Sequence, residues 1–125
     1  VPEKNFWITA TMGTINNNME LTAPVPGAPG MFRCAKEGMM ADIFKPAGLK
    51  NISVTEVPAK MNCGTADVYW NVMTEVAAPI VAALSNADEA LRDKIKKEVI
   101  KNIIEKYPGG NIKVDASALV IYAEK

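Results

Sequence analysis

The sequence predicts an α/β fold with four helices and one antiparallel strand pair, over about residues 51–58 and 111–124. The second of these strands is apolar along one face, and in its second half it becomes apolar on both faces. Such a strand belongs in a wide sheet covered on two sides, and a pair of strands alone is marginal in water. Because few other segments have strand character, we expect residues 1–125 to be a single partial domain whose sheet continues elsewhere.

Composition excludes several classes of partner. The chain has 125 residues, of which 49% are apolar and 22% are charged, as is typical of a globular domain. Its fourteen basic and fourteen acidic side chains cancel, so no charge excess indicates binding to nucleic acid or an anionic membrane. No apolar run approaches the roughly 18 residues of a membrane span, and no leader is recognisable. We expect neither nucleic acid nor membrane as a partner.

Cysteine and histidine usage limits the chemistry. Cys34 and Cys63 lie far apart and form no CxxC pair, which favours two reduced thiols in a cytoplasmic protein. Histidine is absent from the sequence, which removes the commonest general base and the commonest zinc ligand. Catalysis would therefore depend on a carboxylate, a lysine, a tyrosine or a reactive cofactor.

The first third of the chain predicts two helices joined by a loop. Loosely spaced apolar residues indicate a helix from Asn5 to about Met19. Residues 22–30 contain three prolines and two glycines, which predict an irregular, ordered loop. A short helix is expected over residues 35–44, ended by a proline and by Gly48.

The strand over about 51–58 alternates at Ile52 and Val54 and is expected to stop at Pro58. Its natural partner is strand 111–124, paired antiparallel. Glu56 and Asp115 either face each other across this pair or are simply exposed carboxylates.

Two further helices lie between the strands. Thr65 is the expected N-cap of the first, Asp67 complements its dipole, and Pro79 should kink or restart it. Its expected buried stripe comprises Val68, Tyr69, Val72, Met73, Val76, Ile80 and Leu84. Residues 86–89 form a capping-box pattern before the next helix, in which apolar residues recur every four positions from Leu91 to Tyr107.

Five segments of the chain carry a family resemblance: Val1–Trp7, Pro26–Arg33, Ala47–Val54, Gly64–Trp70 and Glu75–Pro79. They resemble the second half of class I S-adenosylmethionine-dependent methyltransferases, whose fold is Rossmann-like. The similarity is greatest to the methyltransferase-11 and ubiquinone/menaquinone-biosynthesis-type branch. There, a Pro-Gly-x-Pro-Gly-x-Phe loop precedes a helix that ends in Ala-Gly-Phe or Ala-Gly-Leu. A Tyr-Trp pair follows the penultimate strand, on a helix that lies over the active site.

The resemblance implies S-adenosylmethionine as the cofactor of the full-length protein. The sequence has no G-x-G-x-x-G pattern; its dense glycine sites, 27–30 and 109–110, are respectively broken by prolines and placed after a helix. No residue therefore inherits a cofactor-binding role, no catalytic or metal-binding residue is assigned, and this chain alone should not methylate anything.

Bulky apolar side chains are the candidates for binding a small, apolar methyl acceptor, since methyl transfer mainly requires alignment and exclusion of water. They are Phe6, Trp7, Met12, Phe32, Tyr69, Trp70 and Met73. The alternative interpretation is that they are ordinary core residues, and Tyr69 in particular a core hydroxyl. Cys63, before a helix start, has either a lowered pKa or the role of a buried structural thiol.

We therefore expect the C-terminal, acceptor-side segment of a methyltransferase, with a missing N-terminal half or a homodimer partner completing the sheet. The rival hypothesis is a non-enzymatic module that completes its sheet by dimerisation. A small-ligand carrier that uses the same aromatic pocket is a third alternative.

Overall fold

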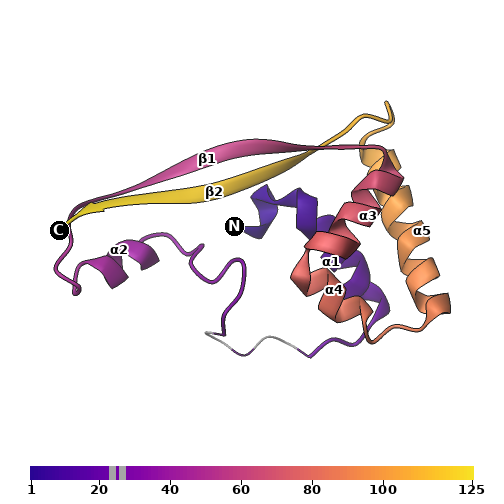
Figure 1. Ribbon diagram of the computed structural model, residues 1–125, viewed down its shortest axis with the longest axis horizontal. Helices are drawn as coiled ribbons and strands as arrows, with labels where there is room; N and C mark the ends of the chain where they lie inside the picture. The colour runs from indigo at the N-terminus through magenta and orange to yellow at the C-terminus, as the bar shows by residue number, and fades with distance from the viewer. Residues whose placement is uncertain (23–24, 26–27) are drawn as a thin grey trace.

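The computed structural model describes residues 1–22, 25 and 28–125 and shows a helical bundle from which a long two-stranded ribbon extends (Figure 1). The bundle helices are α1 (Phe6–Asn18), α3 (Ala66–Val76), α4 (Ala78–Leu84) and α5 (Glu89–Lys106). The antiparallel ribbon is β1 (Lys50–Gly64) and β2 (Ile112–Glu124). Two short helices, η1 (Pro2–Lys4) and α2 (Met39–Phe44), lie beside the ribbon. The mixed helix and strand class and the antiparallel pairing are confirmed.

The start of α3 and the break before α4 lie where local signals predict. Thr65 caps α3, its side chain accepting a hydrogen bond from the amide of Val68 at 3.3 Å. The predicted interruption at Pro79 is confirmed: α3 ends at Val76, and α4 restarts with the proline in its first turn. Within the described ranges of the chain, the four predicted helices therefore become five α-helices, α1 to α5.

The cap of α5 differs from the prediction. The predicted capping box began at Asn86, but the N-cap is Asp88, whose Oδ1 accepts from the amide of Leu91 at 2.8 Å. A turn carries the chain from α4 past Asn86, so the helix starts two residues later. Ile95, Val99 and Ile103 are buried as the four-residue spacing predicts.

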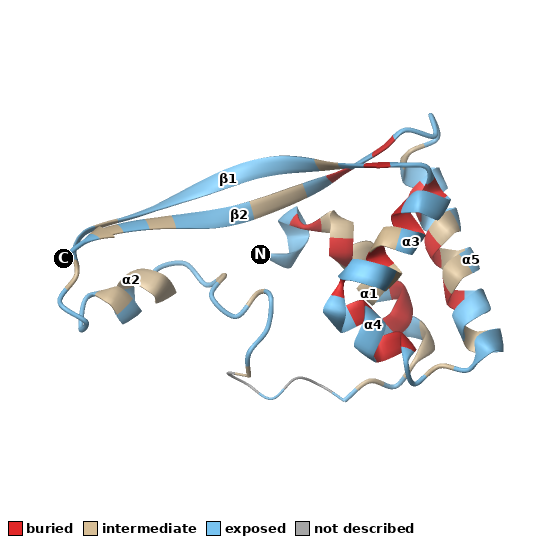
Figure 2. Ribbon diagram, viewed as in Figure 1, coloured by how far each residue is buried: buried red, intermediate tan, exposed pale blue. Residues whose placement is uncertain are grey.

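The core lies within the bundle and at the adjoining end of the ribbon (Figure 2). The side chains that are almost fully buried include Ile15, Tyr69, Met73, Ile80, Leu84, Ile95, Val99, Ile103, Ile112 and Val114. The predicted stripe was wrong for Val68 and Val76, which are 47% and 76% exposed. The face of α3 that packs against the core carries Ala66, Tyr69, Trp70 and Met73. A neighbouring face of the same helix carries residues 68, 72 and 76.

Strand β1 runs through Pro58 to Gly64, so the prediction that it stops at the proline was wrong. Pro58 lies opposite Ser117, and the amide of Ser117 donates away from β1, to Asn5. Residues opposite each other in an antiparallel pair share their orientation, so the nitrogen of Pro58 also points out of the ribbon. A proline is tolerated there because no ladder hydrogen bond is lost.

The segment before β1 is less helical than expected. The predicted helix over 35–44 is reduced to α2, whose N-cap Gly38 has a φ of +77°, a value that favours glycine. The predicted glycine stop is confirmed at Gly48, with a φ of +80°. Of the loop expected over 22–30, residues 23, 24, 26 and 27 lie outside the described residues.

Away from the bundle the ribbon is exposed on both faces (Figure 2). Val54 and Leu119 lie on one face, 45% and 41% exposed, and Val57 and Val120 lie on the other, 44% and 54% exposed. Within this chain, the part of β2 expected to be doubly buried is therefore uncovered. Among the described residues, none of the helices has the length and apolarity needed to cross a bilayer.

Candidate functional site

A groove lies along β2, between the strand and the segments of chain around α1 and α2. Its volume is about 540 Å³. Side chains from three parts of the chain line it, and the large apolar ones are Trp7, Met31, Phe32, Met40, Leu119 and Ile121. We call this the β2 groove. Alternating residues of β2 contribute to it, Ala116 and Ala118 from one face and Ser117 and Leu119 from the other, so the groove follows the strand's edge.

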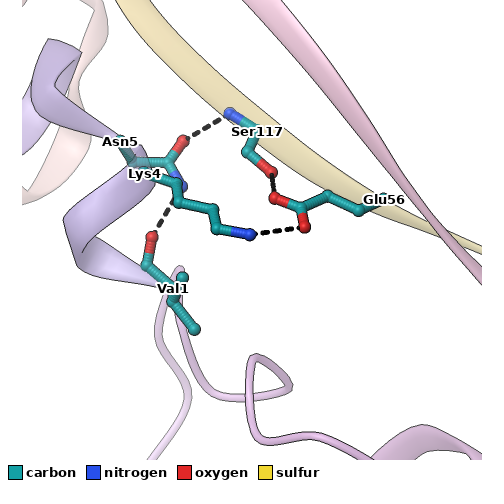
Figure 3. A network of polar contacts seen from close by, with 5 residues as sticks. All are labelled: Val1, Lys4, Asn5, Glu56 and Ser117. Atoms are coloured by element: carbon teal, nitrogen blue, oxygen red, sulfur yellow. Dashed lines mark hydrogen bonds and ion pairs between the residues drawn. The ribbon is translucent and has the colours of Figure 1, made fainter.

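Asn5 organises the end of the β2 groove nearest the bundle (Figure 3). Its side-chain oxygen accepts two hydrogen bonds, each 3.0 Å long, from the amide of Ser117 and from the indole N–H of Trp7. Its side-chain nitrogen donates to the carbonyl of Val1 at 2.9 Å. Asn5 is 5% exposed and occupies the N-cap position of α1, but its side chain makes no capping hydrogen bond and instead holds the Trp7 ring.

A second, adjoining cavity of about 370 Å³ is more polar. Glu56 lies on its wall and accepts from Lys4 Nζ and from the Ser117 hydroxyl, both at 2.6 Å (Figure 3). The hydrogen bonds from Lys4 and then Ser117 lower the pKa of the Glu56 carboxyl. Together the two cavities offer an apolar surface with an ion pair at one end.

The carboxylates Glu56 and Asp115 do not face each other. Glu56 lies opposite Leu119, and Asp115 lies opposite Lys60, with which it forms an exposed ion pair of 2.6 Å. The hydrogen bond from Lys60 lowers the pKa of Asp115. Each carboxylate thus has a cationic partner, which makes both stable anions and poor general bases.

The structure brings together two of the seven residues that the sequence indicated for acceptor binding. Trp7 and Phe32 both line the β2 groove. Tyr69, Trp70 and Met73 lie in the core of the bundle and are 0%, 6% and 1% exposed.

Phe6 and Met12 are half-buried against the core and do not line the β2 groove. Phe6 packs beside Tyr107, and the ammonium of Lys106 lies 3.6 Å from its ring centre.

Tyr69 is a core hydroxyl. It donates to the carbonyl of Trp7 at 2.9 Å and bonds the Thr11 hydroxyl at 2.9 Å. Burial raises the pKa of Tyr69 to about 12. Its proton is held too tightly for acid chemistry near neutral pH, and the side chain instead joins α3 to α1.

The two thiols differ in their surroundings. Cys63 is buried inside β1, and burial raises the pKa of its thiol, so the alternative of a thiol activated by the following helix was wrong. Cys34 is exposed and lines the β2 groove.

Sequence reasoning missed Asn5, Met31 and Met40 as residues of the site. The signal for Asn5 was its place directly before a helix that begins Phe-Trp, where a polar side chain lies within reach of the Trp7 indole. Met31 and Met40 carried no local signal, because only the folded loop and α2 bring them to β2.

The β2 groove can hold and align an apolar molecule. In the part of the chain that the structure describes, no group of three or more acidic or cysteine side chains could hold a metal ion. Protein-family models were compared with the chain and none matches, and no curated protein matches it either.

Proposed function

We propose that this chain is the acceptor-side portion of an S-adenosylmethionine-dependent methyltransferase. One observation carries the proposal: the ribbon exposes apolar side chains on both faces. Val54 and Leu119 are uncovered on one side, and Val57 and Val120 on the other. Two-stranded ribbons are marginal in water, and large apolar surfaces mark interfaces. A wider sheet covered by helices, as in the Rossmann-like methyltransferases that the sequence resembles, would bury all four residues.

The β2 groove would receive the methyl acceptor. Trp7, Phe32 and Met40 give it an apolar wall, and the Asn5 amide holds the Trp7 indole in place. When bound, S-adenosylmethionine supplies an activated methyl group, and the protein's part is to align the acceptor and to exclude water. The residues of this chain would do that, while the cofactor would bind in the other half of the sheet.

The test is cofactor binding by the whole natural gene product. Immunoblotting of source-cell lysate with an antibody to this segment gives the size of that product. Calorimetric titration of the purified product with S-adenosylhomocysteine should then show saturable binding. A product that bound neither S-adenosylmethionine nor S-adenosylhomocysteine would overturn the proposal.

A second candidate function is that of a self-associating module, favoured by the same uncovered ribbon. Two copies would then cover each other's apolar faces without any cofactor. Sedimentation equilibrium of the 125-residue chain is the discriminating measurement. A concentration-dependent dimer together with absent cofactor binding by the natural product would favour this function, whereas a monomer would exclude it.

A further inference from the structure

The orientation of one residue pair fixes which backbone groups of the ribbon point outward. Ser117 donates its amide proton to Asn5, away from β1, and it lies opposite Pro58, which has no amide proton. The pair is therefore one of the non-hydrogen-bonded pairs of the ladder, and these alternate with hydrogen-bonded ones. It follows that Leu119 and Ile121 also direct their N–H and C=O groups away from β1, while Ala118 and Val120 bond to it.

The outer edge of β1 is protected against pairing. By the same alternation, the residues of β1 with outward groups include Glu56, Pro58 and Lys60. Pro58 removes one donor from the middle of this edge, and the two charged neighbours are exposed. Proline and charged side chains are the usual means by which edge strands resist added strands.

The outer edge of β2 lacks such protection. Asn5 occupies its first outward amide, at Ser117. Beyond that residue, the described part of the chain provides no hydrogen bond to the outward groups of Leu119 and Ile121. Residues 116–123 carry no charged side chain and no proline. The β2 groove runs along this edge, and Trp7, Phe32 and Met40 also line it.

We propose that the β2 groove binds an extended, uncharged segment of another polypeptide as an added strand, paired with β2 at Leu119 and Ile121. Main-chain hydrogen bonds would supply the pairing, and alternate side chains of the segment would contact Trp7 and Phe32. Met31, Phe32 and Met40 belong to α2 and the segment before it, and together with β2 they line the groove that the extended segment would enter. The proposal goes beyond methyl transfer, and a strand bound in the β2 groove would compete there with the methyl acceptor proposed above.

Amide hydrogen exchange measured by NMR tests the proposal directly. The probe is a short, blocked peptide of alternating valine and threonine with a lysine tail for solubility. On its addition, exchange at Leu119 and Ile121 should slow by about tenfold or more, and exchange at Ala118 and Val120 should change little because they already bond to β1. The control peptide has the same sequence with alternate amides N-methylated, and it should protect nothing.

A matched pair of variants controls for folding. Ile121→Pro removes an outward amide from β2, and Val54→Pro removes one from β1 at the opposite position of the same pair. Circular dichroism shows whether each variant folds, and only Ile121→Pro should lose peptide binding. Protection of outward β1 amides, or of none, would overturn the proposal.

A second copy of the chain is the other possible occupant. It would be identified if, without peptide, the protection of the Leu119 and Ile121 amides rose with protein concentration. This result too would overturn the proposal. Failure here would leave cofactor binding by the whole gene product unaffected. Conversely, if the gene product did not bind the cofactor, the peptide should still slow amide exchange at Leu119 and Ile121.

Discussion

The side-chain oxygen of Asn5 accepts a hydrogen bond of 3.0 Å from the backbone amide of Ser117, a residue 112 positions later in the sequence. The same oxygen holds the indole of Trp7. The buried side-chain amide of Asn5 therefore joins the start of α1 to the edge of β2, and it orients the Trp7 ring that lines the β2 groove. Because three polar groups depend on Asn5, its removal has consequences that a surface asparagine would not have.

Asn5→Ala should destabilise the chain by about 1–3 kcal/mol, since the indole N–H of Trp7 and the Ser117 amide would lose their partner. Urea denaturation followed by circular dichroism gives the change in the free energy of unfolding. Asn16→Ala, on the exposed side of α1, is the matched control and should change it by less than about 0.5 kcal/mol. Equal effects of the two substitutions would show that the bonds of Asn5 add nothing to stability.

The cap of α5 can be tested with two nearby residues. Asp88→Ala removes the 2.8 Å hydrogen bond to the Leu91 amide and should cost about 1 kcal/mol. Asn86→Ala, at the position that sequence reasoning favoured, should be nearly neutral because the N-cap is Asp88. Thermal or urea unfolding of both variants decides between the positions, and a larger effect at Asn86 would contradict the assignment.

The helices were largely predictable because their signals are local. The Thr65 cap, the break at Pro79 and the four-residue spacing of Ile95, Val99 and Ile103 all act within a few residues of chain. Errors arose where two local signals competed, as between Asn86 and Asp88. Both carry side chains that cap helices well, and the turn after α4 decides which one does so.

The strands and the site were less predictable because they depend on contacts distant in sequence. Whether Pro58 ends a strand depends on which side of the ribbon its nitrogen faces, and that follows from the register with Ser117. Trp7 and Phe32 both line the β2 groove, whereas Tyr69 and Trp70, which are also aromatic, lie in the core. Residue type alone indicated seven candidates for acceptor binding. Only the fold shows which of them line the groove and which lie in the core.

Tyr69→Phe tests the junction between α1 and α3. The substitution leaves the buried Thr11 hydroxyl without its 2.9 Å partner and should cost about 1–3 kcal/mol. Tyr122→Phe is the control, because Tyr122 is exposed and bonds only Glu124, and it should cost less than about 0.5 kcal/mol. If the two changes in the free energy of unfolding were equal, the buried hydrogen bonds of Tyr69 would contribute no net stability.

The alkaline limit of stability should also depend on Tyr69. Its pKa is raised from 10.0 to about 12 in the folded chain. Between these values the folded state holds a proton that the unfolded state has lost, so stability should fall as the pH rises from about 10 to about 12. Burial also raises the pKa of Tyr107, which adds to the same slope. Urea unfolding at a series of pH values should show a shallower decline for Tyr69→Phe, and an unchanged slope would contradict the assignment.

The β2 groove itself can be probed by fluorescence, because the chain has two tryptophans and Trp7 alone lines the groove. In a Trp70→Phe background, a neutral apolar dye such as N-phenyl-1-naphthylamine should accept energy from Trp7 and bind saturably. Phe32→Ala removes the other aromatic ring that lines the groove and should weaken binding about tenfold, which corresponds to about 1.4 kcal/mol. Phe6→Ala is the control, since Phe6 packs against Tyr107 outside the groove and should leave the dissociation constant unchanged. If Phe6→Ala weakened binding and Phe32→Ala did not, the dye would occupy the core side of α1, and the groove would not be the apolar site.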